Sequence, residues 1–208
     1  MSARLYLVTP PAFAPAAFAD VLAAALDAAD VACVRLALEA GEAELRAAAE
    51  ALRPVCAGRD VPLVIARHVR LVKPLGLDGV HLPDGSANAV RAARDALGAD
   101  AVVGAAAGAS RHRGMVAAEA GADYVSLGPV RAGALGDGAE ADAELFAWWA
   151  EVIETPCVAE GGLTPEIARG LAATADFVAP RFSVWSAPDG PAAAVAAYAA
   201  ALDRGAAG

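Results

Sequence analysis

The stretch VAEGGLTPE, residues 158–166, joins the end of an apolar run to two glycines and the start of a helix. Gly161 and Gly162 permit backbone conformations that other residues avoid, and the threonine and proline that follow are typical of a helix N-terminus. Such a junction can bind an anion, because the N–H groups at the start of a helix lack partners within the helix. Glu160 stands immediately before the glycines, and a carboxylate there needs a positively charged neighbour.

The pattern of a short run of branched aliphatic residues followed by an alanine-rich amphipathic segment recurs along the whole chain. This alternation predicts strands followed by helices. We expect strands at 5–9, 32–36, 62–66, 78–82, 101–105, 123–128, 156–161 and 176–180. We expect helices at about 15–29, 40–57, 68–76, 86–98, 111–121, 139–154, 164–173 and 190–203.

Eight apolar strands alternating with helices indicate an α/β protein whose parallel sheet is covered by helices. A closed (β/α)8 TIM barrel and an open doubly wound sheet both fit this description. The number of strands favours the barrel, as does the segment TPPAFAP (9–15), which lacks the glycine fingerprint of a dinucleotide-binding sheet. We therefore expect one TIM-barrel domain over residues 1–208, with phosphate held at the loops after the seventh and eighth strands.

Composition excludes several classes of partner. The chain of 208 residues carries a net charge of −9, which argues against nucleic acid and anionic membranes. Its longest uncharged stretch, 5–19, contains three prolines and is too short to span a bilayer. The three cysteines (Cys33, Cys56 and Cys157) are widely spaced in apolar surroundings, so we expect buried thiols in a reducing cytoplasm and no metal site.

Four segments together resemble the thiamine phosphate synthase/TenI family. They are LYLVT (5–9), DGVHL (78–82), AGADYVSLGPV (120–130) and VAEGGLTPE (158–166); the family's counterparts read approximately LYLVTD, DGVHLGQ, AGADYVGFGPV and AIGGI. The resemblance implies a barrel of thiamine metabolism. Synthases of this family join a hydroxymethylpyrimidine diphosphate to a thiazole phosphate and release pyrophosphate with the help of Mg²⁺. TenI-type members bind thiazole phosphates and carry out different chemistry.

The chain departs from this family where the diphosphate and Mg²⁺ are held. After the second strand the family has Q-x-R-x-K, and Arg35, Ala37 and Glu39 stand at those positions. After the third strand it has Asn-Asp, and Ala66 and Arg67 stand there. The family resemblance therefore implies Mg²⁺, but its usual ligands are replaced.

Three further family positions differ as well. The second metal carboxylate corresponds to Ser86, although Asp84 lies close to it. The serine and histidine of the fifth-strand loop have no direct counterpart, and Ser110, Arg111 and His112 come slightly later with roles that the sequence leaves open. The lysine after the sixth strand is missing, and Arg131 is the cation offered instead. Because leaving-group stabilisation is electrostatic, we expect synthase activity far below that of a standard member.

Arginines follow several of the expected strands and give two interpretations. They could replace the metal, because guanidinium groups bind phosphate oxygens in pairs. Alternatively, some point outward to neighbouring carboxylates. These arginines are Arg35, Arg67, Arg111, Arg131 and Arg181. The arginines at neighbouring strand ends are the available partners of Glu160, and we expect Arg181 in particular.

These considerations assign roles to the candidate site residues. The predicted catalytic residues are Arg35, Arg67 and His81, where His81 is either a general acid or base or a structural residue. The predicted phosphate-binding residues are Gly161, Gly162, Arg181 and Ser183. The predicted substrate-binding residues are His68, Asp84, Arg131 and Glu160.

Three functions remain open. The first is a thiamine phosphate synthase-like barrel that binds a small phosphorylated heterocycle with reduced or altered turnover. The second is a TenI-like or non-catalytic regulatory barrel that binds a phosphate ligand. The third is an isomerase of another phosphate-binding family that uses His81 and Glu160 as acid and base. Trp148 and Trp149 diverge on one helix, so a homodimer interface is also considered.

Overall fold

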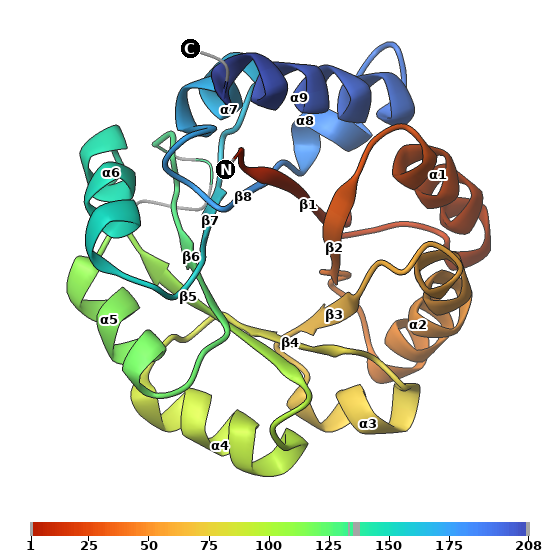
Figure 1. The fold of residues 1–208 in the computed structure, drawn as a ribbon. Coiled ribbons are helices and arrows are strands. Elements are labelled where there is room, and N and C mark those ends of the chain that lie inside the picture. Colours follow the sequence, from red (N-terminus) through yellow and green to blue (C-terminus); the bar gives the residue numbers. More distant parts are fainter. Residues whose placement is uncertain (1, 133, 135–137, 207–208) are drawn as a thin grey trace.

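Eight parallel strands close into a barrel in the computed structural model, which describes residues 2–132, 134 and 138–206. Figure 1 looks along the barrel axis, and the helices form a ring around the strands. The strands are β1 Arg4–Val8, β2 Val31–Leu36, β3 Leu63–Ala66, β4 Gly79–Leu82, β5 Val102–Gly108, β6 Tyr124–Leu127, β7 Cys157–Glu160 and β8 Phe177–Ala179. Because β1 pairs with both β2 and β8, the expected closed barrel is confirmed over an open sheet.

The helices follow the strands in the expected order. Their bounds are α1 Pro15–Asp27, α2 Glu42–Ala57, η1 Val69–Leu71, α3 Val72–Leu75, α4 Ala87–Leu97, α5 Arg111–Glu119, α6 Ala143–Val152, α7 Pro165–Leu171, α8 Phe182–Trp185 and α9 Pro191–Ala206. None of the helices in the described part of the chain is long and apolar enough to cross a bilayer.

One predicted helix differs from the structure, and one short helix was not predicted. The single helix expected at 68–76 is a 3-10 turn followed by one α-helical turn, because Pro74 has no N–H to continue a longer α-helix. Gly76 then ends α3 in a left-handed conformation, with φ +60°. The short helix α8 was not expected, since four residues are too few to show a helical period.

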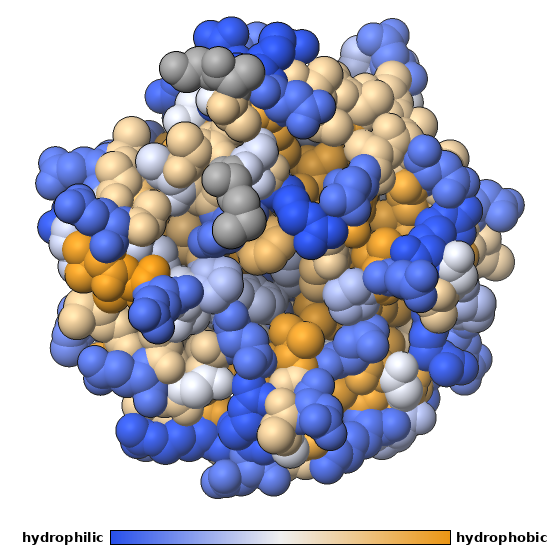
Figure 2. Space-filling view, viewed as in Figure 1, coloured by the Kyte–Doolittle hydropathy of each residue, from blue (hydrophilic) through white to orange (hydrophobic). Residues whose placement is uncertain are grey.

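The core has two parts. The larger part lies between the sheet and the helices and is apolar, whereas a second cluster fills the inside of the barrel. The residues of the second cluster are Tyr6, Val8, Cys33, Val64, Tyr124, Val158 and Ala179. On the face shown in Figure 2, hydrophilic side chains alternate with apolar ones around the ring of helices.

Polar residues replace apolar ones at one end of the barrel interior. Arg35, His81, Ser126 and Glu160 are all buried, and each lies close to the C-terminal end of its strand. Buried polar groups are costly unless they are paired. This layer therefore costs stability that an apolar layer would not, and it lies at the end of the barrel where active sites are found. It is the candidate site.

Candidate functional site

A pocket of two compartments opens at the C-terminal ends of the strands. The wide compartment, about 640 Å³, is lined by residues from the ends of β2, β3 and β4, including Ala37, Glu39, Arg67, His68 and His81. The glycine compartment, about 290 Å³, is lined by residues that follow β7 and β8, including Gly161, Gly162, Leu163, Phe182 and Ser183. Val8, Arg35, Glu160 and Arg181 line both compartments.

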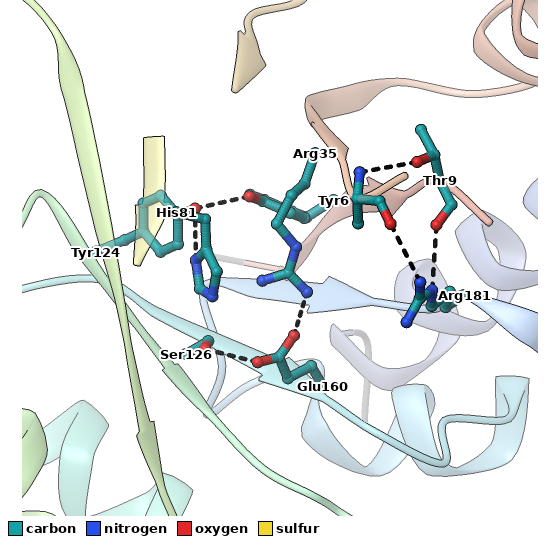
Figure 3. A network of polar contacts seen from close by, with 9 residues as sticks. Tyr6, Thr9, Arg35, His81, Tyr124, Ser126, Glu160 and Arg181 are labelled. Atoms are coloured by element: carbon teal, nitrogen blue, oxygen red, sulfur yellow. Dashed lines mark hydrogen bonds and ion pairs between the residues drawn. The ribbon is translucent and has the colours of Figure 1, made fainter. Parts of the chain in front are cut away.

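Arg35 and Glu160 form a buried ion pair at the junction of the two compartments (Figure 3). Glu160 also accepts a hydrogen bond of 2.7 Å from the Ser126 hydroxyl. Burial acts to raise the pKa of the Glu160 carboxyl, but the charge of Arg35, with His81 and the hydrogen bonds from Arg35 and Ser126, holds that pKa below its ordinary value. The expectation that Arg181 neutralises Glu160 is wrong, because Arg35 reaches across the barrel interior to do so.

Arg181 instead ties the ends of two strands together. Its Nε donates to the carbonyl oxygen of Thr9 at 3.1 Å, and its Nη2 donates to that of Ala37 at 3.4 Å (Figure 3). Partial burial and then the nearby charge of Arg35 lower the pKa of the Arg181 guanidinium. Arg181 therefore has a structural task, although its side chain lines both compartments.

His81 belongs to a chain of hydrogen bonds inside the barrel (Figure 3). Its Nδ1 lies 3.0 Å from the hydroxyl of Tyr124, which lies 2.7 Å from the hydroxyl of Tyr6. Burial first and the charge of Arg35 second lower the pKa of His81 to about 3. The imidazole is therefore neutral near pH 7, and protonating it would cost free energy.

The glycines after β7 adopt the conformations that their sequence suggested. Gly161 has φ +86° and Gly162 has φ +78°, both in the left-handed region. A Cβ at Gly162 would lie 2.5 Å from the Cβ of Arg131, so the loop after β6 packs directly on this glycine. Among the described residues, none accepts a hydrogen bond from the N–H of Gly162 or Ser183. Both groups are therefore free to bind an anion in the glycine compartment.

Arg67 lies at the mouth in an unusual backbone conformation. Its φ is +71°, which L-residues other than asparagine and aspartate seldom adopt. Its N–H donates to the carbonyl oxygen of His81 at 2.9 Å, and its side chain lines the wide compartment together with His68. The strained position that the family gives to a carboxylate is therefore occupied here by a cation.

Three other candidate residues are not among those that line the two compartments. Asp84 accepts hydrogen bonds from the N–H and hydroxyl of Ser86, which caps α4. Arg131 is exposed, and its N–H donates to the carbonyl oxygen of Gly161. Arg111 pairs with Glu144 on the outer ring of helices, which matches the outward-pointing alternative for that arginine.

Ser183 lines the glycine compartment, but its hydroxyl is already engaged. Tyr198 donates to the carbonyl oxygen of Leu163 at 2.7 Å, so the 2.7 Å contact between the two hydroxyls uses the proton of Ser183. A hydroxyl held in this way accepts more readily than it donates. The main-chain N–H of Ser183 is thus the better donor for a phosphate.

With this geometry established, known proteins identify the group to which the chain belongs. Residues 5–182 match the family described as thiamine monophosphate synthase. The chain belongs to the thiamine monophosphate synthase family. A thiamine-phosphate synthase of Rhodospirillum centenum is 49% identical, over 94% of this chain and 95% of the relative. One of Hyphomonas neptunium is 40% identical, over 94% of this chain and 91% of the relative.

A solved structure agrees with the fold of this family. The thiamine phosphate pyrophosphorylase of Pyrococcus furiosus superposes with a TM-score of 0.81, covering 97% of this chain and 96% of that chain. Its sequence is only 21% identical, so the agreement concerns the barrel itself. The resemblance proposed from the four sequence segments is thereby confirmed.

Ser126, Tyr124 and Thr9 belong to this polar layer but were not predicted from the sequence. Ser126 stands where the family segment AGADYVGFGPV has a glycine, and that difference was the available signal. Tyr124 is two residues earlier on β6 and so points to the same side of the sheet. The hydroxyl oxygen of Thr9 accepts a hydrogen bond of 2.9 Å from the N–H of Ala37. This contact joins two separate chain segments, so no local sequence pattern predicts it.

The residues present do not fit Mg²⁺ as the family holds it. Mg²⁺ prefers carboxylate oxygens, and among the described residues lining the two compartments the carboxylates are Glu39 and Glu160. Both oxygens of Glu160 are already bonded, to Arg35 and to Ser126. No group of three or more His, Cys, Asp or Glu that could hold a metal ion occurs in the described part of the chain.

Proposed function

We propose that this chain is a thiamine-phosphate synthase-type barrel that holds two phosphorylated heterocycles side by side in its mouth. The glycine compartment takes a phosphate monoester, of the class of the thiazole phosphate, on the N–H groups of Gly162 and Ser183. The wide compartment takes the pyrimidine partner. The observation that carries this proposal is that two compartments of unequal size meet at Arg35 and Glu160. A joining reaction needs such adjacent sites.

The proposed reaction forms one bond and breaks another. The thiazole nitrogen attacks the methylene carbon of the pyrimidine, and the carbon–oxygen bond to the diphosphate breaks with release of pyrophosphate. Charge then develops on the leaving diphosphate. Arg67 and Arg181 line the wide compartment and supply positive charge there. His81 is neutral and accepts or donates hydrogen bonds without adding charge.

We expect this route to be slow and insensitive to Mg²⁺. The carboxylates that would hold the ion are replaced, and the sole lysine of the sequence, Lys73, donates to the carbonyl oxygen of Ala96 on the outer ring. Each missing donor to developing charge costs about 3–4 kcal/mol in the barrier. Arginine side chains compensate for part of that loss.

A TenI-like or non-catalytic ligand-binding barrel is the second candidate. It is favoured by Glu39, which lines the wide compartment at the position where the family pattern has a lysine. A carboxylate there repels a diphosphate but does not affect the phosphate in the glycine compartment. A protein of this kind would bind the phosphate ligand but would not catalyse the synthase reaction.

The cytoplasm is the proposed compartment, supported by three buried cysteines without disulfides. The proposed partner is a small phosphorylated heterocycle. A homodimer stays a prediction; Trp149 is buried, and Trp148 stacks with Arg111 on the outer ring. Sedimentation of the full chain at several concentrations tests it.

Calorimetric titration and a synthase assay together test the function. Thiazole phosphate and thiamine phosphate should each bind with and without Mg²⁺, and the assay with both precursors should give thiamine phosphate slowly at either condition. Binding without product would favour the second candidate. No binding of either ligand would overturn the proposal, and fast Mg²⁺-dependent turnover would show that the substitutions are misinterpreted.

A further inference from the structure

We infer that Glu160 is the positioning residue for Arg35, and that Arg35, Glu160 and Ser126 act as one unit at the junction of the two compartments. We call these three residues the Arg35 unit. The inference deepens the proposed function and rests on it for the identity of the ligand. It gives Glu160 a role different from the substrate-binding role predicted from the sequence, and that earlier prediction stays open.

The contacts show that each member depends on the others. Glu160 accepts from the Arg35 guanidinium at one carboxylate oxygen and from the Ser126 hydroxyl at the other. All three residues are buried. A buried cation or carboxylate without its partner is strongly unfavourable. Any one of these residues alone would therefore be costly in the barrel interior.

The same three positions are departures from the family pattern. Arg35 stands where the family has glutamine, Ser126 where AGADYVGFGPV has glycine, and Glu160 where AIGGI has isoleucine. They come from β2, β6 and β7, which are far apart in the sequence. The fold brings these three exceptions into direct contact. The hydrogen bonds therefore link all three of these positions directly.

The unit leaves part of the guanidinium for a ligand. Nη2 of Arg35 is used by Glu160, whereas Nη1 has no hydrogen-bond partner among the described residues and the side chain lines both compartments. The Nε atom is buried and also lacks a partner among those residues. A guanidinium offers only donors in a fixed plane, whereas a glutamine amide offers both a donor and an acceptor. The group facing Arg35 must therefore present lone pairs, either as a ring nitrogen or as a phosphate oxygen.

The plane of Arg35 is fixed from two directions. The guanidinium carbon lies 5.6 Å from the ring centroid of Tyr6 on one side. Glu160 holds the end of the side chain, and Ser126 in turn holds Glu160 (Figure 3). Loss of the Glu160 contact would allow the guanidinium to rotate away from the junction. Ligands that span both compartments would lose affinity, while a ligand confined to the glycine compartment would not.

Three substitutions at residue 160 separate positioning from charge. In Glu160→Gln the amide oxygen can accept from Arg35 and the amide NH₂ can donate to Ser126, so the geometry survives without the charge. Glu160→Asp keeps the charge but shortens the arm. Glu160→Ala removes both. If charge alone mattered, the alanine and glutamine variants would behave alike.

Thiamine phosphate spans both compartments, and inorganic phosphate probes the glycine compartment alone. We expect Glu160→Ala and Glu160→Asp to weaken thiamine phosphate binding by about tenfold or more. The affinity of Glu160→Gln for thiamine phosphate should stay within about threefold of the wild-type value. The affinity of every folded variant for inorganic phosphate should also stay within about threefold of the wild-type value. Equal losses in the glutamine and alanine variants would overturn the positioning role, as would wild-type affinity in the alanine variant.

A reversion tests the unit as a whole. Arg35→Gln, Glu160→Ile and Ser126→Gly are made singly and together, and thiamine phosphate affinity and urea unfolding are measured for each. The triple variant should bind and fold better than the sum of the single losses predicts, and additive losses would overturn the unit. If the wild-type chain binds neither thiamine phosphate nor inorganic phosphate, the proposed function is overturned instead. The urea unfolding measurements would still show whether the three residues act together.

To separate the two kinds of lone-pair group, inorganic pyrophosphate and the hydroxymethylpyrimidine alcohol are titrated into wild type and Glu160→Ala. If only pyrophosphate binds more weakly to Glu160→Ala than to wild type, a phosphate oxygen faces Arg35. If only the alcohol binds more weakly, a ring nitrogen faces Arg35. If neither probe loses affinity, Arg35 does not contact the ligand and the inference is wrong.

Discussion

The two compartments of the mouth differ in what lines them: mainly main chain in one and mainly side chains in the other. The glycine compartment is lined by the main chain after β7, where Gly161 and Gly162 adopt left-handed conformations and the N–H of Gly162 has no acceptor among the described residues. The wide compartment is shaped by side chains, including Arg35, Arg67 and His81. A site made of backbone survives changes of side chain around it, whereas a site made of side chains is redefined by each substitution. This explains why the family resemblance is close at one compartment and poor at the other.

The largest expected effect comes from blocking the main-chain compartment. In Gly162→Val a β-branched residue would have to adopt φ +78°, and its Cβ would collide with Arg131. We expect a loss of about 1–3 kcal/mol in the free energy of unfolding and the loss of inorganic phosphate binding. Urea unfolding and calorimetric titration measure these two quantities.

Gly170→Ala is the matched control for that change. Gly170 lies in α7, and a Cβ there would meet nothing within 4 Å. Alanine in a helix is more stable than glycine by about 0.5–1 kcal/mol. Phosphate binding by Gly162→Val at the affinity of Gly170→Ala would show that the glycine compartment is not the phosphate site.

Acid sensitivity should be the next largest effect, and it belongs to the side-chain compartment. The pKa of His81 is lowered to about 3 by burial and by Arg35, so the unfolded chain binds a proton that the folded chain does not. Stability is complete above the ordinary histidine pKa of about 6.5 and is lost as the pH falls toward 3. The slope from this group approaches about 1.4 kcal/mol per pH unit.

The measurement is urea unfolding between pH 7 and pH 4, with His81→Asn as the comparison. The variant should lose less stability over this range than the wild type. The other histidines, His68 and His112, are exposed and are present in both proteins. Parallel pH curves would mean that His81 is not held in its neutral form by the fold.

A smaller effect should separate strain from function at Arg67. Arg67→Gly relieves a left-handed conformation that costs an L-residue about 1–2 kcal/mol, and the added freedom of glycine in the unfolded chain offsets about half of this. We expect unchanged or slightly higher stability together with weaker pyrophosphate binding. Pyrophosphate affinity equal to that of the wild type would remove Arg67 from the anion site.

The smallest effect is expected on the outer ring. Arg111 pairs with Glu144 at 3.1 Å and stacks on Trp148, and both partners of the ion pair are largely exposed. Exposed pairs contribute about 0–1 kcal/mol. Arg111→Ala should therefore change stability by less than about 1 kcal/mol and leave thiamine phosphate affinity unaltered. A tenfold change in that affinity would assign Arg111 to the mouth after all.

Local sequence was a good guide wherever a single element decides the outcome. The glycines after β7, the cap residue Thr164 and the alternation of strand and helix all act within a few residues, so their structure was predictable. The partner of Glu160 was not predictable in this way. Arg181 is the nearer candidate in the chain, yet it is drawn to the carbonyl groups of Thr9 and Ala37.

The amino-acid sequence by itself determined the eight-stranded barrel and the glycine loop after β7, because both rest on local conformational preference and hydrophobic period, and four of its segments indicated the family. Only the tertiary structure decided that Arg35, Glu160 and Ser126 meet inside the barrel. Their strands lie apart along the chain, and closure of the sheet brings their side chains into one buried layer. Burial then forces the charges to pair, and this pairing is the observation from which we infer that Glu160 positions Arg35.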